Sequence, residues 1–422
     1  MRHTSNFIFL ILYSVVAGAQ TDLTMSGHFM KDTSQDVLLK LQGNYFFASN
    51  VITNKFAGDY FQGKFLTEDL KDNVSKNLSA QNIFAGEAGW EASLTFHPDT
   101  GNNKVEAFIA YRSRSHSDAR FSADFFNLFF RGNKMYGGKT AELGDFFFQQ
   151  YSYRQFVFGI GNQFAVPGNA KLYVGADIAI NQGIKFLKVI GRSASLYTDP
   201  GGEFIDADLH ATIFTDDSAA QHPSRLDGSG YSGDVYIEYA TEKSNMNFSV
   251  ENFGSIHWNK WSTEVSLDST FHFDGIDVRD IFDIGDSIQV KDVGLDSVFY
   301  KNYVQDKSEH RVNTQLPMKI SGSYTQFFHE NKLAATIGID VLLNTYSQMR
   351  YFAAMNYRFS RSNEAGIVVS TGGYTGFHAG IRLAHVFPWH LKAELGSSYI
   401  YPMVTYETGK SQGAYLSLSK SF

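Results

Sequence analysis

Ten charged residues are the side chains of this chain whose types and spacing best suit chemistry. Each lies on the polar side of a segment in which apolar residues recur at every second position, the pattern of a β-strand. If these polar sides face one interior, opposite charges on neighbouring strands can pair there. Both signs occur and no ring of one sign is evident, so two interpretations stay open: a selective passage, or a filled, non-conducting interior. The ten residues are Glu91, Glu106, Arg112, Asp177, Glu238, Glu251, Arg358, Arg382, Lys392 and Glu394.

Other groups of residues favour no reaction. Every third residue from Asp274 to Asp286 is an aspartate, but the spacing is not that of a known calcium loop, so we expect a solvated surface and no metal site. His257 stands beside Trp258 without a serine and an acid at useful spacing. No phosphate loop, zinc spacing or dinucleotide fingerprint occurs. We therefore expect no catalytic residues, no enzyme and no cofactor. The net charge of -7 gives no reason to expect a nucleic-acid partner.

Residues 231–261 show how strands would position such charges. Val235, Ile237 and Tyr239 alternate with polar residues, a polar break follows at 241–245, and a second alternating run begins at Phe248. Two such runs around a break predict an antiparallel hairpin. A soluble sandwich would bury the apolar side against a second sheet. A membrane barrel would turn it to lipid, and its lipid-facing residues would then include Val235, Ile237, Ile337, Ile339, Ile381 and Leu383.

The first residues have the features of an export signal. Arg2 and His3 precede an apolar run at 7–16, and Ala17, Gly18 and Ala19 supply small residues for cleavage. We expect cleavage after Ala19 or one residue later. The run of about ten residues is too short to cross a bilayer as a helix. The sequence contains no cysteine, so an exported chain needs a source of stability other than disulfides, and a closed hydrogen-bonded barrel is one such source.

The region before the barrel is expected to be mixed. Residues 20–85 would form a plug-like segment and the first strand, which we place at 37–49. Residues 66–78 have helical spacing, and Thr67 is a plausible N-cap because acidic residues follow it in the first turn.

Residues 86–422 are expected to form the barrel itself. Within them, residues 121–130 (FSADFFNLFF) are apolar without a period of two, which favours a short helix or a plug. The polar stretch at about 279–316 predicts an extended loop, which is long for a compact soluble domain but ordinary on the external side of a membrane barrel. Counting alternating runs gives roughly fourteen to sixteen strands, each near the length that crosses a bilayer when tilted.

Four short segments carry a family resemblance. They are residues 28–35 (HFMKDTSQ), 127–133 (NLFFRGN), 230–239 (GYSGDVYIEY) and 252–258 (NFGSIHW). In these segments the chain resembles the uncharacterised outer-membrane proteins of the Bacteroidota that share the long-chain fatty-acid transporter type of barrel. That group also resembles the barrel subunit of the type 9 secretion apparatus. The transporter type often has an Asn-Pro-Ala near its N-terminus where this chain has residues 38–43 (LLKLQG), so no ligand residues are carried over.

The expected fold is therefore an all-β transmembrane antiparallel barrel in a bacterial outer membrane. The resemblance implies fourteen strands, within a range of 12–16 from the pattern. Passage of small hydrophobic molecules is the leading hypothesis, with the N-terminal segment and residues 121–130 obstructing or gating the interior. The alternative is a structural or accessory subunit of a larger envelope or secretion complex. The expected partners are outer-membrane lipid, a hydrophobic small molecule and envelope proteins.

Overall fold

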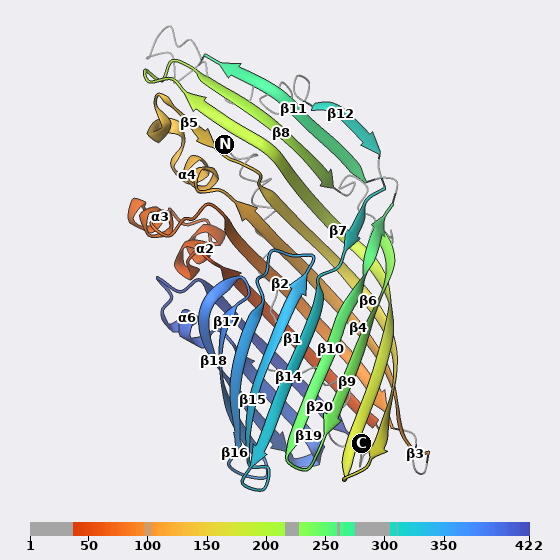
Figure 1. The fold of residues 1–422 in the computed structure, drawn as a ribbon. Coiled ribbons are helices and arrows are strands. Elements are labelled where there is room, and N and C mark those ends of the chain that lie inside the picture. The colour runs from red at the N-terminus through yellow and green to blue at the C-terminus, as the bar shows by residue number, and fades with distance from the viewer. Residues whose placement is uncertain are drawn as a thin grey trace.

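Fourteen strands form a closed antiparallel barrel in the computed structural model (Figure 1), which describes residues 37–97, 99–100, 103–215, 228–259, 262–274, 304–309 and 311–422. Each strand pairs with the next around the ring, and the last pairs with the first, with Leu38 opposite Ser421 and Ala48 opposite Ser411. The expected fold class is confirmed. In order around the ring the strands are β1 (Val37–Ser49), β2 (Asn82–Phe96), β4 (Asn103–Phe121), β6 (Phe147–Val166), β7 (Ala170–Thr198), β9 (Gly228–Ala240), β10 (Ser244–Trp258), β14 (Met318–Phe328), β15 (Leu333–Leu343), β16 (Arg350–Arg358), β17 (Asn363–Gly372), β18 (Thr375–Phe387), β19 (Leu391–Ser397) and β20 (Ser411–Ser421).

The apolar sides of the strands face outward. The six residues predicted to face lipid are 37–63% exposed, although they belong to the most regular strands of the chain. They are Val235, Ile237, Ile337, Ile339, Ile381 and Leu383. In a sandwich these side chains would be covered by a second sheet. Their neighbours in sequence, such as Asp234 and Thr336, are instead buried. Because side chains alternate across a strand, the barrel has an apolar exterior and a polar interior.

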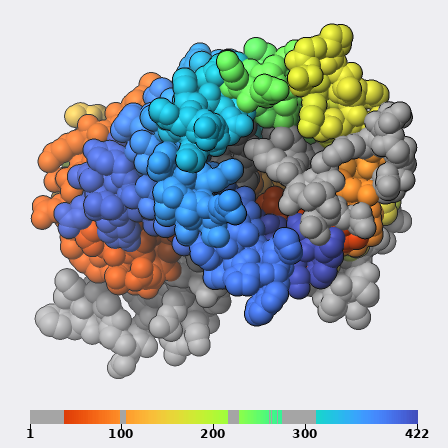
Figure 2. Space-filling model, turned by 90° about the horizontal axis from the view of Figure 1, so that it is seen from below, coloured from red at the N-terminus to blue at the C-terminus, as the bar shows by residue number. Residues whose placement is uncertain are grey.

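The two ends of the barrel differ. One end, here called the short-turn end, holds brief connections such as 167–169 and 241–243, and the last strand finishes there. Figure 2 views the barrel from this end. The opposite end, here called the loop end, carries the longer connections. This asymmetry is typical of outer-membrane barrels, which have short periplasmic turns and longer external loops.

A sheet extends beyond the barrel at the loop end. The 29-residue strand β7 pairs with β6 and β9 in its first part and with β5 (Lys139–Glu142) and β8 (Ile205–Thr215) in its last part. Strand β8 pairs with β11 (Thr263–Phe273), and β11 pairs with β12 (Val304–Glu309). Two further short strands, β3 (Asp99–Thr100) and β13 (Asn313–Gln315), pair with β4 and β10. The prediction of a loop over 279–316 was therefore wrong at its end, where β12 and β13 lie. Residues 275–303 lie outside the described residues, as do the aspartates from Asp277 to Asp286.

In the part of the chain that the structure describes, four short α-helices join strands at the loop end. They are α2 (Asn54–Phe61), α3 (Glu68–Ser75), α4 (Ala123–Arg131) and α6 (Ile400–Val404). The prediction of a helix capped by Thr67 is confirmed, because the Thr67 side chain accepts a hydrogen bond from the Leu70 N–H at the start of α3. Most of the apolar run at 121–130 lies in α4, which Ser122 caps in the same way, whereas Phe121 ends β4. Among the described residues, no helix combines the length and the apolar character needed to cross a membrane.

Candidate functional site

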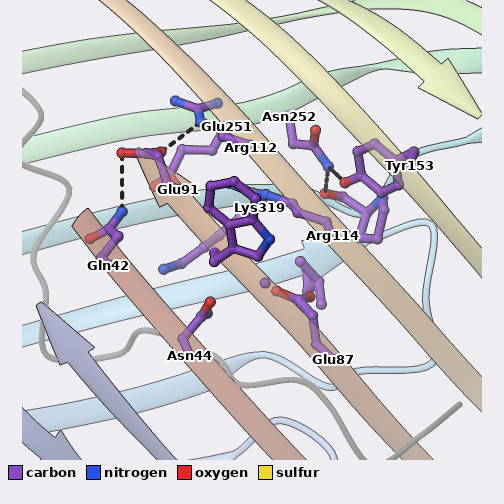
Figure 3. Close-up of a pocket in the computed structure, with 14 residues that line it drawn as sticks. Gln42, Asn44, Glu87, Glu91, Arg112, Arg114, Tyr153, Glu251, Asn252 and Lys319 are labelled. Carbon is purple, nitrogen blue, oxygen red and sulfur yellow. Dashed lines mark hydrogen bonds and ion pairs between the residues drawn. The ribbon is translucent and has the colours of Figure 1, made fainter. Parts of the chain in front are cut away.

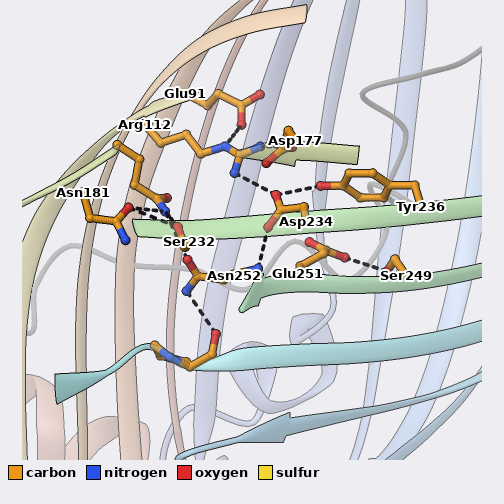
Figure 4. A network of polar contacts seen from close by, with 12 residues as sticks. Glu91, Arg112, Asp177, Asn181, Ser232, Asp234, Tyr236, Ser249, Glu251 and Asn252 are labelled. Carbon is orange, nitrogen blue, oxygen red and sulfur yellow. Dashed lines mark hydrogen bonds and ion pairs between the residues drawn. The ribbon is translucent and has the colours of Figure 1, made fainter. Parts of the chain in front are cut away.

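Arg112 is the centre of a buried ion network inside the barrel (Figure 4). Its side chain is 1% exposed. Nε lies 2.7 Å from Glu91 Oε2, Nη1 lies 2.9 Å from Asp234 Oδ2, and Nη2 lies 3.6 Å from Asp177 Oδ2. Glu91 is the register partner of Arg112 on the neighbouring strand, and Asp234 is that of Asp177. A guanidinium that presents five donors in a rigid fork suits such a set of carboxylates.

Asn252 extends this network into the neighbouring strands. It lies at a bulge of β10, where the register shifts between Val250 and Phe253, and its φ is +61°. Its backbone N–H donates to Asp234 Oδ1 at 2.5 Å, and Nδ2 donates to the hydroxyl of Tyr153 at 3.1 Å. Asparagine tolerates positive φ better than most residues. Neither Asn252 nor the role of Asp234 beside Arg112 was predicted from the sequence, because alternation does not show where a strand bulges.

Four more of the predicted interior charges form a second cluster near the short-turn end. Arg382 donates from Nε and Nη2 to Glu394 at 2.8 and 3.0 Å. Lys392 Nζ lies 3.1 Å from Glu394. Arg358 lies 3.8 Å from Glu364, which also pairs with Arg382, but the Arg358 side chain is 56% exposed and so belongs to the rim.

Of the remaining three predicted charges, Glu251 lines a polar cavity together with Glu91 and Arg112, and the other two lie apart from these clusters. Glu106 pairs with His97 at 2.7 Å. Glu238 accepts a hydrogen bond from Asn245 Nδ2, and Glu251 accepts one from Ser249 at 2.9 Å. The structure thus brings Glu91, Arg112 and Asp177 together and gathers the C-terminal charges into another group. It does not place the ten side chains in one constellation.

The interior has little free space at the level of Arg112. A polar cavity of about 80 Å³ lies there, with Glu87, Arg114 and Lys319 among its lining residues (Figure 3). A polar space of this size suits a few waters. Nearer the loop end, an apolar layer crosses the interior, made by Phe46, Ala48, Ile83, Ala85, Leu342, Tyr374 and Tyr399. The described side chains therefore fill the barrel axis at two levels, and they include no group of three or more metal-ligating residues.

A larger, apolar space lies outside the barrel wall among the described residues. It is a cavity of about 230 Å³, which we call the phenylalanine cavity. Its floor is the outward side of the wall. Four register neighbours form this floor, namely Phe84, Ala119, Phe148 and Val189. They share strand faces with exposed residues lower on the wall, such as Trp90. Its remaining lining comes mainly from α2 and α4, which flank the strands in Figure 1, and includes Phe56, Ala57, Tyr60, Phe125, Phe126, Phe129 and Phe130.

Few polar groups reach the phenylalanine cavity. Arg120 is the one ionised residue of its lining, and its charge is already engaged by Asp145 at 2.5 Å and by the ring of Tyr346, 4.9 Å from Arg120 Cζ. Burial raises the pKa of Tyr60, so its hydroxyl stays neutral. Such a lining can desolvate a neutral apolar molecule but offers little to an anion. The sequence showed the apolar run at 121–130 but not that it would cover the outside of the wall rather than plug the interior.

Comparison with models of known protein families identifies the family of this chain. Residues 35–390 match the family of unknown function DUF5723. The chain belongs to this family. The comparison with curated proteins gives no match.

Among solved structures, similar chains include the Pseudomonas putida toluene transporter TodX (10% identity, 93% of this chain and 91% of that one, TM-score 0.43). The Ralstonia pickettii toluene transporter TbuX (8%, 92% and 90%, 0.43) and a Pseudomonas aeruginosa FadL homologue (10%, 92% and 90%, 0.41) are similar to the same degree. At these identities and scores the function of this chain has to be argued from its own residues.

Proposed function

We propose that this protein is a bacterial outer-membrane barrel that captures small apolar molecules in the phenylalanine cavity and passes them inward. The cavity is the single observation that carries the proposal. It is about 230 Å³ in volume and its lining is almost wholly apolar. An unfilled apolar space lowers the stability of the fold, and a concave apolar space is the common form of a small-molecule site.

The cavity sets the size and the charge of the proposed ligand. At a packing density of about 0.75, it accepts a molecule of roughly 170 Å³, on the order of ten carbon atoms. Each buried CH₂ group contributes about 0.8 kcal/mol to binding. The ligand would be neutral, because Arg120 is already paired with Asp145 and an unpaired carboxylate would lose its hydration without compensation. The proposal is for transport, with no catalytic role.

The outward apolar surface supports a location in the outer membrane, with lipid as the surrounding partner. Exposed side chains such as Ile337 (63%) and Phe158 (52%) would be poorly placed in water. The short-turn end would face the periplasm and the loop end the outside. The phenylalanine cavity, which belongs to the loop end, would then meet molecules arriving from outside the cell. The cleaved export signal at residues 1–19 is part of the same proposal.

Filling the cavity tests this function. Ala57 lines the cavity and is 4% exposed, so Ala57→Leu places three more carbon atoms in the ligand's space. Binding of the fluorescent probe naphthalene, which has ten carbon atoms, to the barrel in lipid nanodiscs should weaken about tenfold, or 1.4 kcal/mol. Ala353→Leu adds the same atoms on the lipid-facing side of β16 and should leave binding unchanged. Equal binding by both variants and the natural protein would show that the probe does not use this cavity.

The packed interior favours a second candidate function. A barrel whose axis is closed at the levels of Arg112 and Phe46 suits a structural or accessory subunit of a larger envelope complex. This alternative predicts that the natural protein neither binds the probe nor speeds its entry into cells. It also predicts that the protein leaves native membranes in a complex of defined size.

A further inference from the structure

A row of polar side chains, here called the lysine row, crosses four neighbouring strands near the short-turn end. Ser93 on β2 is the register partner of Lys40 on β1. Lys40 is in turn opposite Ser419 on β20, which is opposite Lys392 on β19. Directly opposite residues on neighbouring strands project their side chains from the same face of the sheet. The two lysines therefore flank Ser419, with their strands two spacings or about 10 Å apart.

The lysine row faces the interior of the barrel. Leu39 and Leu41, on either side of Lys40, are 46% and 50% exposed on the outer surface, so alternation directs Lys40 inward. Ser93 is only 5% exposed. The row also lies close to the mouth of the barrel, because the C-terminus three residues after Ser419 lies at the base of the molecule in Figure 1. The side chain of Lys392 is still 42% exposed there, so ions from the solution at this end have access to the row.

Positive charge exceeds negative charge in this part of the interior. Near the short-turn end, the described inward-facing charges of β1 and of β16 to β20 are four cations and two carboxylates, an excess of two positive charges. They are Lys40, Arg358, Arg382, Lys392, Glu364 and Glu394. Both carboxylates are already bound by the arginines or by Lys392. The ammonium group of Lys40 forms no ion pair and no hydrogen bond with any residue that the structure describes.

Hydroxyl groups without partners accompany these cations. Ser93 and Ser417 are 5% and 6% exposed, and within the described parts of the chain neither their hydroxyls nor that of Ser419 forms a hydrogen bond. Ser417 lies one level deeper than the row, opposite Gln42. An ammonium has three donors and no acceptor, and each hydroxyl has one donor. Polar groups that are largely buried usually have a partner. Here the donors and the excess positive charge both favour an anion as that partner.

We infer that the lysine row binds a small inorganic oxyanion of the phosphate or sulfate class at the short-turn mouth of the barrel. Lys40 and Lys392 approach the ion from two sides, and Ser419 donates a hydrogen bond from between them. Hydrogen bonds from a charged donor to a charged acceptor are the strong kind. An oxyanion with two negative charges matches the local excess of two positive charges, and its oxygens accept from several directions at once.

This site goes beyond the proposed function and does not depend on it. The phenylalanine cavity is apolar and lies at the loop end, whereas the lysine row is polar and lies at the opposite end. A free ion is a better match than a lipid headgroup, because the row faces the interior and lipid would contact the outer surface. Loss of either site should therefore leave binding at the other unchanged.

Calorimetric titration of inorganic phosphate into the full-length barrel in dodecyl maltoside tests the site at constant ionic strength. We expect a dissociation constant on the order of 1 mM. Lys40→Gln should weaken binding at least about tenfold, because one of the two flanking charges is lost. Lys40→Arg keeps the charge and should stay within about threefold of the natural protein.

Lys420→Gln is the matched control for this titration. Lys420 follows Ser419 but points the other way, with its Nζ 4.8 Å from the centre of the Phe422 ring, so its loss should leave phosphate binding unchanged. Heat-modifiable gel mobility shows that each variant is folded. The site would be overturned if the natural protein binds no phosphate, if it binds anionic lipid but not the free ion, or if Lys40→Gln and Lys420→Gln bind phosphate equally.

The absence of cysteine from the sequence allows an independent measurement of the local potential. Ser419→Cys places a thiol between the two lysines. Ser323→Cys is its control, because Ser323 also faces the interior but is opposite the uncharged Asn247 and Gly338. The rate with an anionic methanethiosulfonate, divided by that with a cationic one, should be at least about tenfold higher at position 419 than at position 323. Phosphate should slow the anionic reagent at position 419 alone. Equal ratios, no protection by phosphate, or a thiol at position 419 that neither reagent reaches would each overturn the anion site.

Discussion

Replacing Arg112 should destabilise the barrel more than any other single loss of charge in its interior. Arg112→Gln keeps much of the volume of the side chain and removes the positive charge. Three carboxylates, on Glu91, Asp177 and Asp234, then lie within a buried space without their common partner. Removing one member of a buried ion pair typically costs 3–5 kcal/mol, because the remaining charge stays desolvated. With three carboxylates left, we expect the upper part of that range, about 5 kcal/mol.

Arg382→Gln is the matched control for this prediction. Arg382 faces two carboxylates, and its side chain is 11% exposed, so water can reach the site. Lys392 Nζ also remains 3.1 Å from Glu394 after the change. We expect a loss of about 1–3 kcal/mol, the cost of leaving a polar group unsatisfied. The assay is reversible urea unfolding in lipid vesicles, followed by tryptophan fluorescence. Equal losses in the two variants would refute the idea that burial and the number of carboxylates set the cost.

Three further predictions concern other parts of the molecule. Ile337→Arg changes a residue that is 63% exposed on the outward face, and near the bilayer midplane this substitution should cost about 2–4 kcal/mol in the same unfolding assay. Tyr357→Arg, next to the turn at 359–362, should cost about 1 kcal/mol or less. Equal costs would contradict the placing of Ile337 near the midplane and of Tyr357 near the membrane edge. Burial, together with a 2.9 Å hydrogen bond to Asp124, raises the pKa of Tyr136 to about 12. Folding thus favours the neutral hydroxyl, so the stability that it contributes is complete below pH 10 and is lost as the pH rises toward 12. Tyr136→Phe should abolish this pH-dependent step in an ultraviolet difference titration. Ser122→Ala removes the cap of α4 and should cost about 1 kcal/mol of stability. Because α4 lines the phenylalanine cavity, the same substitution should weaken probe binding. Thr67→Ala, which uncaps α3, should leave probe binding unchanged.

Alternation in the sequence predicted the most regular strands and the residues that share a face of each strand. Ile337 and Leu383 lie on strands whose period of two is unbroken, but their outward exposure was predicted only because the export signal and the lack of cysteine favoured a membrane barrel over a sandwich. The helix at Thr67 could be predicted for a similar reason, since capping depends on residues three positions apart. Signals of this kind are local, and they survive in any barrel that keeps the strand intact.

The features of the candidate site depend on contacts between distant residues. Arg112 meets Asp234, which lies 122 positions later, and alternation shows only that both side chains face inward. The bulge at Asn252 and the β12 and β13 strands arise from pairing with neighbours that a single sequence does not reveal. The run at 121–130 is apolar enough to plug an interior or to cover an exterior. Its outward position follows from the path of the chain after β4, which no spacing within the run specifies.

The packed interior and the external cavity together constrain how any transport would work. Passage along the barrel axis would have to separate Arg112 from its carboxylates, and each such charge would be left desolvated at a cost of several kcal/mol. An apolar ligand cannot compensate for this cost, because it forms no hydrogen bonds with the freed groups. Any route of lower barrier for an apolar molecule therefore avoids the ion network, which can then remain intact and keep the barrel rigid.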